Sequence, residues 1–241
     1  MKIGIIGAMT EEIEDLKSRI GDFKTEERAG FSFFIGKIYN EEIILLLSGI
    51  GKVNAAMGTT LLIERFQPDC IINTGSAGGF SKDLSIGDIV ISTEVRHHDV
   101  DATVFGYEYG QVPRMPAAYI ANSILISMAE KAVEKLTDVS TSKGLIATGD
   151  SFMHKDEHIR AIREKLPTMM AAEMEAAAIA QCCHNFGLPF VIIRSISDIA
   201  GDEENQIDFN EFLKVAAANS ARMVLEIIIL ISEYEKSHFE E

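Results

Sequence analysis

Short apolar runs alternate with stretches of helical periodicity from one end of the chain to the other. Several of the runs are apolar throughout, as expected for strands of a sheet that is covered on both faces. This order of elements predicts an α/β domain. The predicted strands span residues 2–8, 31–38, 43–48, 70–74, 89–94, 144–148 and 190–195. The predicted helices span residues 11–20, 53–66, 118–136, 156–164, 174–186 and 210–235.

The pattern continues without a linker, a repeat or a low-complexity stretch over the 241 residues. That length suits one large domain with a substantial core. We therefore expect a single domain over residues 1–235, followed by a frayed tail at 236–241.

The net charge of the chain argues against some classes of binding partner. The net charge is −15, and the lysines and arginines are scattered without a basic run. Such a chain is a poor partner for nucleic acid or an anionic membrane. The first apolar run ends at Met9 and is followed at once by acidic residues, which does not fit a signal peptide. The apolar stretch 224–231 is far shorter than the ~20 residues of a membrane span, so we expect a cytoplasmic protein.

Neither the cysteines nor the histidines form a metal-binding pattern. Cys70, Cys182 and Cys183 fall in apolar segments without ligand spacing and are expected to be buried, inert thiols. His154 and His158 are four residues apart but lack the glutamate of a zincin motif, so we expect them at the surface. No cofactor and no metal are predicted.

Two acidic residues lie in segments that are otherwise apolar. Glu175 interrupts the run 169–180, and Asp198 closes the strand-like segment that starts at residue 190. Burying an unpaired carboxylate is unfavourable, so residues placed this way are candidates for acid–base chemistry. Each alone could equally be structural, with Glu175 in an ion pair and Asp198 capping a helix. Their occurrence together beside Arg194 favours a functional site.

Two glycine-rich segments follow predicted strands. Residues 4–9 lack the third glycine of a dinucleotide-binding fingerprint, and the chain has no Walker lysine. Residues 73–79 (Asn-Thr-Gly-Ser-Ala-Gly-Gly) are predicted to form a turn whose N–H groups could bind a phosphate, an oxyanion or sugar hydroxyls, or merely a tight turn. Glu12, Ser76 and Asp198 all follow predicted strands. Because α/β sheets bind ligands at the carboxyl ends of their strands, these residues are expected to share a pocket.

Four motifs occur in an order and spacing that together resemble a known family. They are Gly-Ala-Met-Thr-Glu-Glu at 7–12, the glycine-rich segment at 73–79, Ala-Glu-Met-Glu-Ala at 172–176 and Arg-Ser-Ile-Ser-Asp at 194–198. The chain resembles the 5′-methylthioadenosine/S-adenosylhomocysteine nucleosidases of the nucleoside phosphorylase superfamily, from Lys2 to the C-terminal helix. The resemblance implies a three-layer α/β/α sandwich around a twisted, partly barrel-like mixed sheet, and a homodimer.

The resemblance also assigns roles to residues. It implies that Asp198, helped by Ser197, protonates N7 of adenine, and that Glu175 binds the ribose hydroxyls. It implies that Glu12 activates the attacking water, with Arg194 and Ser76 nearby. The other implied substrate-binding residues are Gly78 of the glycine-rich segment, Phe152 stacked on the purine, the backbone of Met153 at its edge, Met9, Ile50, Met174 and Phe209 around the ribose and 5′-thioalkyl group, and Phe105, Tyr107 and Pro113 from a neighbouring subunit.

The reaction explains why acids with different protonation states are needed. An N-glycosidic bond breaks through an oxocarbenium-like sugar, as in glycoside hydrolysis generally. A free aspartate with a pKa near ~3.9 is ionised at neutral pH and cannot supply the proton that adenine needs to leave. We therefore expect burial to raise the pKa of Asp198, whereas Glu12 must be ionised to take a proton from water.

Phosphorolysis and nucleoside sensing are the two alternative functions. Phosphorylases of the superfamily carry an arginine in the position matched by Asn73 and another basic residue near that of Glu12, and phosphate beside Glu12 would be repelled. A non-catalytic nucleoside sensor has no support, because the acid, the water-binding glutamate and the ribose ligand are all present. The subunit-crossing loop departs from the family at Ala102, which is smaller than the expected valine.

Two points stay open at the level of the sequence. Methylthioadenosine, S-adenosylhomocysteine and 5′-deoxyadenosine all fit the implied pocket as substrates. The apolar helix segment 53–58 could form part of a dimer interface or could equally pack inside one subunit.

Overall fold

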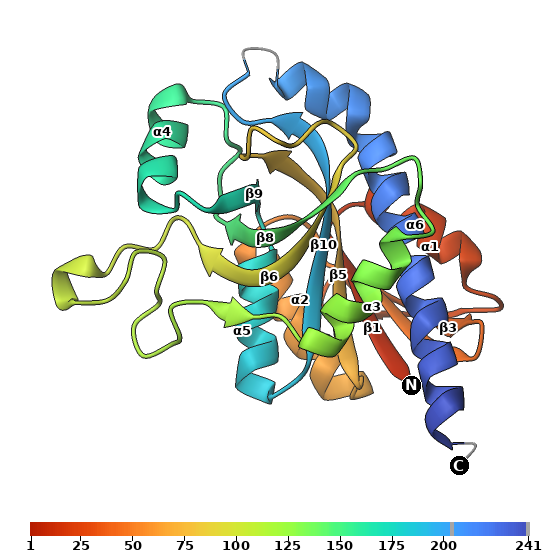
Figure 1. Cartoon of the computed structure of the whole chain (residues 1–241). Coiled ribbons are helices and arrows are strands. Elements are labelled where there is room, and N and C mark those ends of the chain that lie inside the picture. Colours follow the sequence, from red (N-terminus) through yellow and green to blue (C-terminus); the bar gives the residue numbers. More distant parts are fainter. Residues whose placement is uncertain (203–204, 240–241) are drawn as a thin grey trace.

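The computed structural model describes residues 1–202 and 205–239, with side chains for 1–202 and 209–234. Within this part, ten strands form one mixed sheet (Figure 1). The strands are β1 (Lys2–Gly7), β2 (Lys24–Arg28), β3 (Phe31–Ile38), β4 (Glu41–Leu47), β5 (Cys70–Gly79), β6 (Ile89–His97), β7 (Tyr119–Ile120), β8 (Thr141–Thr148), β9 (Met169–Glu173) and β10 (Phe190–Ile199). The helices are α1 (Thr10–Arg19), α2 (Lys52–Phe66), η1 (Thr103–Phe105, a 3₁₀ turn), α3 (Ser123–Val133), α4 (Asp156–Lys165), α5 (Ala176–Phe186) and α6 (Asn205–Phe239).

The sheet closes on itself over half of its strands. Strand β5 pairs with β1, β9 and β10, and β10 pairs in turn with β6, which leads through β8 back to β9. These five strands therefore form a ring, while β1, β4, β3 and β2 continue outward from β5 as an open sheet. The partly barrel-like mixed sheet implied by the resemblance is confirmed.

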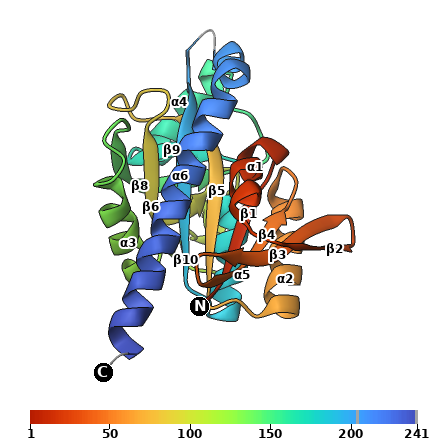
Figure 2. The ribbon, with the colours of Figure 1, turned by 90° about the vertical axis from the view of Figure 1, so that its right-hand side faces the viewer.

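Helices cover both faces of the sheet. Helices α1, α3 and α6 pack on one face and bury an apolar cluster that includes Leu16, Leu125 and Ile227. Helices α2 and α5 pack on the other face around a second cluster that includes Leu62 and Ile179 (Figures 1 and 2). Both faces of the sheet are thus apolar, which explains the non-alternating runs in the sequence. The predicted α/β/α sandwich is confirmed.

Helix α6 is the longest helix of the described chain and lies across the sheet (Figure 2). Its stretch Phe209–Tyr234 is long and apolar enough to cross a membrane by length and composition, but 56% of the apolar window is buried inside the protein. The apolar residues at 224–231 therefore belong to the core. The helix runs to Phe239, and residues 240–241 of the expected tail lie outside the described residues.

The structure differs from the predicted elements at several positions. Strands β2, β7 and β9 were not predicted: β2 is a polar edge strand (Lys-Thr-Glu-Glu-Arg), and β9 is rich in alanine and methionine, which favour helices. The predicted helix 118–136 starts only at Ser123, where Asn122 accepts hydrogen bonds from two backbone N–H groups. Tyr119 and Ile120, which precede the helix, form strand β7 and pair with β6 instead.

The glycine-rich segment 73–79 is strand rather than the predicted turn. Strand β5 continues through Gly79 because β10 pairs with it along its whole length and β9 joins at its end. A side chain could not be placed freely there, since a Cβ at Gly78 would lie 3.2 Å from the Asp198 carboxylate and one at Gly79 3.0 Å from Ile199. The glycines allow close approach of neighbouring side chains and do not reverse the chain.

Candidate active site

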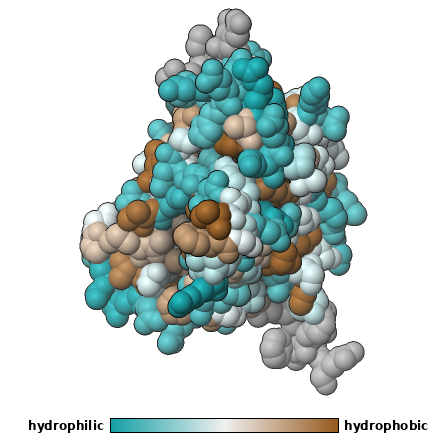
Figure 3. Space-filling model, turned by 90° about the vertical axis from the view of Figure 1, so that its left-hand side faces the viewer, coloured by the Kyte–Doolittle hydropathy of each residue, from teal (hydrophilic) through white to brown (hydrophobic). Residues whose placement is uncertain are grey.

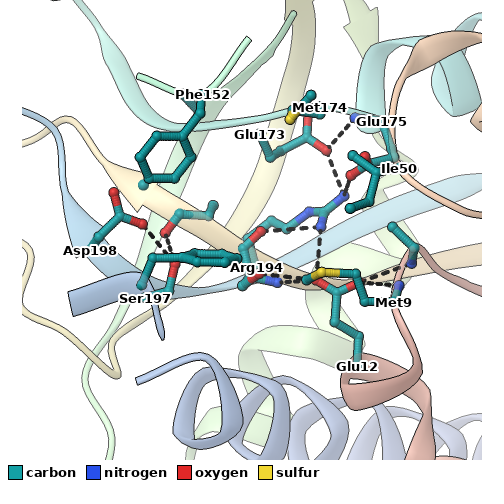
Figure 4. Close-up of a pocket in the computed structure, with 16 residues that line it drawn as sticks. Met9, Glu12, Ile50, Phe152, Glu173, Met174, Glu175, Arg194, Ser197 and Asp198 are labelled. Atoms are coloured by element: carbon teal, nitrogen blue, oxygen red, sulfur yellow. Dashed lines mark hydrogen bonds and ion pairs between the residues drawn. The ribbon is translucent and has the colours of Figure 1, made fainter. Parts of the chain in front are cut away.

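A pocket opens where the carboxyl ends of the strands meet the following helices and loops. Strands β1, β4, β5, β8, β9 and β10 each lead into it, and the side chains that they carry converge on the guanidinium of Arg194 and on Asp198 (Figure 4). It is lined by Ala8, Met9, Glu12, Ile50, Ser76, Ala77, Gly78, Phe152, Ala172, Glu173, Met174, Glu175, Arg194, Ser197, Asp198 and Phe209. Glu12, Ser76 and Asp198 thus share a pocket, although Ser76 and Asp198 lie within strands instead of after them.

Most of the residues expected at the site line this pocket. They are Met9, Glu12, Ile50, Ser76, Gly78, Phe152, Met174, Glu175, Arg194, Ser197, Asp198 and Phe209. Met153 lines an adjoining small cavity that shares Phe152 and Asp198. Phe105, Tyr107 and Pro113 do not line the pocket of their own chain, and Phe105 is 80% exposed on a projecting loop. Sequence reasoning missed Ala8, Ala77, Ala172 and Glu173.

The centre of the pocket floor is the guanidinium of Arg194, which is 1% exposed. Its Nη1 donates to the Ser76 carbonyl at 3.2 Å, and its Nη2 donates to Asn73 Oδ1 at 2.8 Å. Gly75 makes room for this arrangement, because a Cβ there would lie 2.3 Å from Nη1 and 2.6 Å from Glu12 Oε1. Asn73 therefore anchors the Arg194 guanidinium through its side-chain oxygen.

Glu173, the acid that sequence reasoning missed, holds Arg194 and the start of α5 together. Its Oε2 accepts from Arg194 Nη2 at 2.5 Å and from the N–H groups of Glu175 and Ala176 at 2.9 and 2.8 Å. Its other oxygen accepts from the Thr148 hydroxyl. A negative charge at a helix N-terminus is favourable. Glu173 lies two residues before Glu175, at the end of β9 and just before α5. This spacing is the signal in the sequence from which it could have been found.

Glu175 is the N-cap residue of α5, not part of the helix as predicted. Its Oε1 accepts from Gly51 N at 2.8 Å, and its Oε2 lies 3.4 Å from Arg194 Nη2. Burial raises the pKa of Glu175 to about 8, although Arg194 acts in the opposite direction. The carboxyl therefore holds its proton to a higher pH than a free glutamate does, and its protonated form can both donate and accept hydrogen bonds.

Glu12 is held rigidly at the opposite side of Arg194. Its Oε2 accepts from the N–H groups of Ala8 and Met9 at 2.9 and 3.2 Å. Its Oε1 accepts from Ser76 N at 2.9 Å and Ser76 Oγ at 3.0 Å. The carboxylate is 2% exposed, and Arg194 Nη1 lies 3.9 Å away. Four hydrogen bonds fix both carboxylate oxygens, so Glu12 faces the pocket in a single orientation.

Asp198 lies on the other side of the pocket, beneath Phe152 (Figure 4). Its carboxyl is 2% exposed, and Ser197 Oγ donates to its Oδ1 at 2.8 Å. Phe152 makes an edge contact with Phe209, with ring centroids 5.7 Å apart, so two aromatic rings border this end of the pocket. A flat heterocycle between Phe152 and the strand would lie within reach of Asp198.

The cysteines and the His154/His158 pair lie outside the pocket. Cys70 and Cys183 are buried, and burial raises the pKa of Cys70 to about 12, as expected for inert thiols. Cys182 is only half-buried. His154 and His158 are exposed, as predicted. Among the described residues, no group of three or more histidines, cysteines and acids is arranged to hold a metal ion.

Comparisons with known proteins agree with this geometry. Residues 2–229 match the family model of the phosphorylase superfamily. The 5′-methylthioadenosine/S-adenosylhomocysteine nucleosidase of Chromohalobacter salexigens is 56% identical over 92% of this chain and 94% of its own length.

Two solved structures are similar over nearly the whole fold. The nucleosidase of Neisseria meningitidis in complex with methylthio-immucillin-A has a TM-score of 0.92 and 50% identity, covering 94% of this chain and 98% of its own. The nucleosidase of Colwellia psychrerythraea in complex with adenine has the same TM-score and identity and covers 94% of both chains.

Proposed function

The chain belongs to the phosphorylase superfamily and, within it, to the 5′-methylthioadenosine/S-adenosylhomocysteine nucleosidases, and from its pocket we propose how it cleaves these nucleosides. It is an enzyme that hydrolyses an N-glycosidic bond. The observation that carries the mechanism is the placement of two buried acids on opposite sides of one pocket. Asp198 is held by Ser197 near an aromatic slot, and Glu12 is fixed by four hydrogen bonds across from it.

Asp198 acts as the general acid. With adenine stacked against Phe152, the carboxyl donates its proton to N7 as the bond between N9 and C1′ lengthens. The bonding electrons pass to the purine, which leaves as neutral adenine. Ser197 Oγ, 2.8 Å from Oδ1, orients the carboxyl and stabilises the carboxylate that remains. A positioned acid of this kind contributes roughly 10²–10⁴ in rate.

Glu12 acts as the general base that activates the attacking water. The oxocarbenium-like sugar is attacked at C1′ by a water whose proton passes to the Glu12 carboxylate, giving the free 5-thioribose product. Ser76 and Arg194 line the same side of the pocket and fix Glu12 through hydrogen bonds and charge. Glu175 binds the ribose hydroxyls, and its protonated carboxyl serves as donor and acceptor at once.

Phosphorolysis is disfavoured by what surrounds Arg194. Of the described residues that line the pocket, Arg194 is the one with a permanent positive charge. It is already bound to Glu173, Glu175 and the Asn73 amide, and Glu12 lies 3.9 Å from it. A phosphate dianion would have to displace Glu173 and the Asn73 amide from Arg194 and would meet the like charge of Glu173. Water, which is neutral, has no such barrier.

We also propose that the enzyme works as a cytoplasmic homodimer whose pocket is completed by the partner. The wall around the 5′ group is incomplete within one subunit, because Ile50 is 50% exposed. The other residues of this wall are Met9, Met174 and Phe209. Exposed apolar side chains lie just before and on α2 (Ile50, Val53 and Met57) and on the η1 loop (Val104 and Phe105). The side of the molecule from which that loop projects carries groups of apolar side chains among polar ones (Figure 3). Phe105, Tyr107 and Pro113 would enter the partner's pocket.

The experiment that tests the mechanism is Asp198→Asn. The amide keeps the shape and a hydrogen bond to Ser197 but has no acidic proton, so kcat for 5′-methylthioadenosine should fall at least about 10²-fold. Binding of the nucleoside, measured by calorimetry, should stay within a few-fold of the wild-type affinity. The control Asp138→Asn alters an exposed acid paired with Arg222 and should leave both quantities unchanged. Full activity of Asp198→Asn would remove Asp198 from the role of proton donor.

A further inference from the structure

Three residues outside the pocket lining form a closed ring of polar contacts beside it. Lys52 N donates to Asp150 Oδ1 at 2.8 Å, and Asp150 N donates to Asp99 Oδ2 at 3.0 Å. Lys52 Nζ closes the ring by pairing with Asp99 Oδ1 at 2.7 Å. The three residues come from three different loops or helix starts, after β4, β6 and β8. Each member contacts both of the others.

The ring adjoins the two walls between which the nucleoside would lie. Lys52 begins α2 directly after Gly51, whose N–H donates to Glu175 Oε1 at 2.8 Å, and after Ile50, which lines the pocket. Asp150 precedes Phe152, the aromatic wall at the base end. The contacts of Lys52 with Asp150 and Asp99 therefore tie the ribose end of the pocket to the base end.

The ring contacts the N–H side of the turn that contains Gly51. The φ of Gly51 is +95°, a conformation that favours glycine, and no side chain caps the N-terminus of α2 from within the helix. The Asp150 carboxylate supplies the missing acceptor for Lys52 N, and a Cβ at Gly51 would lie 3.2 Å from the same oxygen. With Lys52 N bound to Asp150, the preceding N–H is directed at Glu175. Asn54 Nδ2 and Ala55 N hold the carbonyls of Ile50 and Gly51, so Asp150 is the residue that fixes the N–H side of the turn.

The Lys52–Asp99 ion pair is largely shielded from solvent, which strengthens it and lets it hold this geometry. The two side chains are only 21% and 26% exposed, and Asp99 also accepts from a backbone N–H. The pKa of Asp99 lies below its ordinary value because hydrogen bonds from Lys52 and Asp150 outweigh its burial. Charged hydrogen bonds of this kind are stronger than neutral ones.

We propose that Asp99 and Asp150 are positioning residues, which hold Gly51 N–H on Glu175 and so set the ribose-binding carboxyl relative to Phe152. The inference rests on the proposed function, in which Glu175 binds the ribose hydroxyls. Neither acid touches the reacting atoms. Contacts to the ribose hydroxyls exist before and during the reaction, so loosening Glu175 removes binding from both states. The expected kinetic signature is a raised KM with kcat little changed.

The test compares Asp150→Ala with Asp150→Asn. The alanine variant loses the acceptor for Lys52 N, whereas asparagine keeps an oxygen in the same place. Asp150 is exposed in its loop, so neither change is expected to unfold the protein. For 5′-methylthioadenosine we expect Asp150→Ala to raise KM about tenfold with kcat within twofold, the size of one lost hydrogen bond. Asp150→Asn should restore most of the wild-type KM, and Asp138→Asn is the matched surface control.

A double-mutant cycle shows whether the effect passes through Glu175. In a Glu175→Ala background, Asp150→Ala should raise KM by less than twofold, because no side-chain acceptor for Gly51 N is left to be positioned. An unchanged KM in Asp150→Ala, or a tenfold rise in both backgrounds, would overturn the inference. If the wild-type protein itself releases no adenine, the proposed function fails instead, so the two failures are distinguishable.

Discussion

The pKa of Glu175 leads to a definite dependence of stability on pH. Burial raises this pKa from its ordinary value of 4.5 to about 8. Between those values the folded protein keeps a proton on Glu175 that the unfolded chain has lost. Stability due to this group is therefore greatest below pH 4.5 and decreases as the pH rises to about 8. The shift corresponds to a decrease on the order of 5 kcal/mol across the window, since one pKa unit is about 1.4 kcal/mol.

Glu175→Gln removes the titration while keeping the size of the side chain. At low pH the variant should be less stable than the wild type by a constant offset. The offset arises because an amide cannot accept from both Gly51 N and Arg194 Nη2, which lie 2.8 and 3.4 Å from the two carboxyl oxygens. As the pH rises, the wild-type protein loses the stability that its protonated carboxyl supplied. The variant should therefore gain on the wild type by several kcal/mol between pH 5 and pH 8.5.

The assay is urea unfolding of both proteins at half-unit steps over that range, with ligand absent. The difference in unfolding free energy between the two proteins isolates Glu175, because the other titrating groups are common to both. Curves that stay parallel over the whole range would refute the reasoning, since they would mean that Glu175 titrates at or below its ordinary pKa and that Arg194 offsets or outweighs its burial.

Three further changes have expected outcomes. Arg194→Met leaves the Glu173 carboxylate buried without its cation, so the unfolding free energy in urea at pH 7 should fall by about 3–5 kcal/mol; a loss under about 1 kcal/mol would contradict the central place of Arg194. Gly78→Ala puts a Cβ 3.2 Å from Asp198 Oδ2, so kcat should fall at least about tenfold while the unfolding midpoint changes little. Phe105→Ala should raise KM without altering the fold if this exposed ring enters a partner's pocket, and the wild-type specific activity should drop on dilution below the dimer dissociation constant; activity independent of both would argue for a self-contained subunit.

Much of the pocket could be predicted because its acids stand out against apolar surroundings. Glu175 and Asp198 interrupt segments that are otherwise core, and Glu12 follows a short apolar strand. The layered α/β order was likewise readable, since buried parallel strands are apolar on both faces and helices repeat every 3.6 residues. The family motifs then supplied roles that patterning alone left open between structure and catalysis.

The rest depended on contacts between distant segments. The glycines at 75, 78 and 79 were predicted to turn the chain, but they lie in β5, where Arg194 and Asp198 approach from β10. Glu173 was overlooked because its partners Arg194 and Thr148 come from other strands. The ring of Lys52, Asp99 and Asp150 carries no sequence signal, since its members are ordinary charged loop residues brought together only by the sheet.

The most direct test of the account is a product analysis with 5′-methylthioadenosine in the presence and absence of inorganic phosphate. The account predicts adenine and free 5-methylthioribose, formed at the same rate in both solutions, because Glu12 activates water and Arg194 is occupied by Asn73, Glu173 and Glu175. Adenine together with methylthioribose 1-phosphate, formed only when phosphate is present, would contradict it.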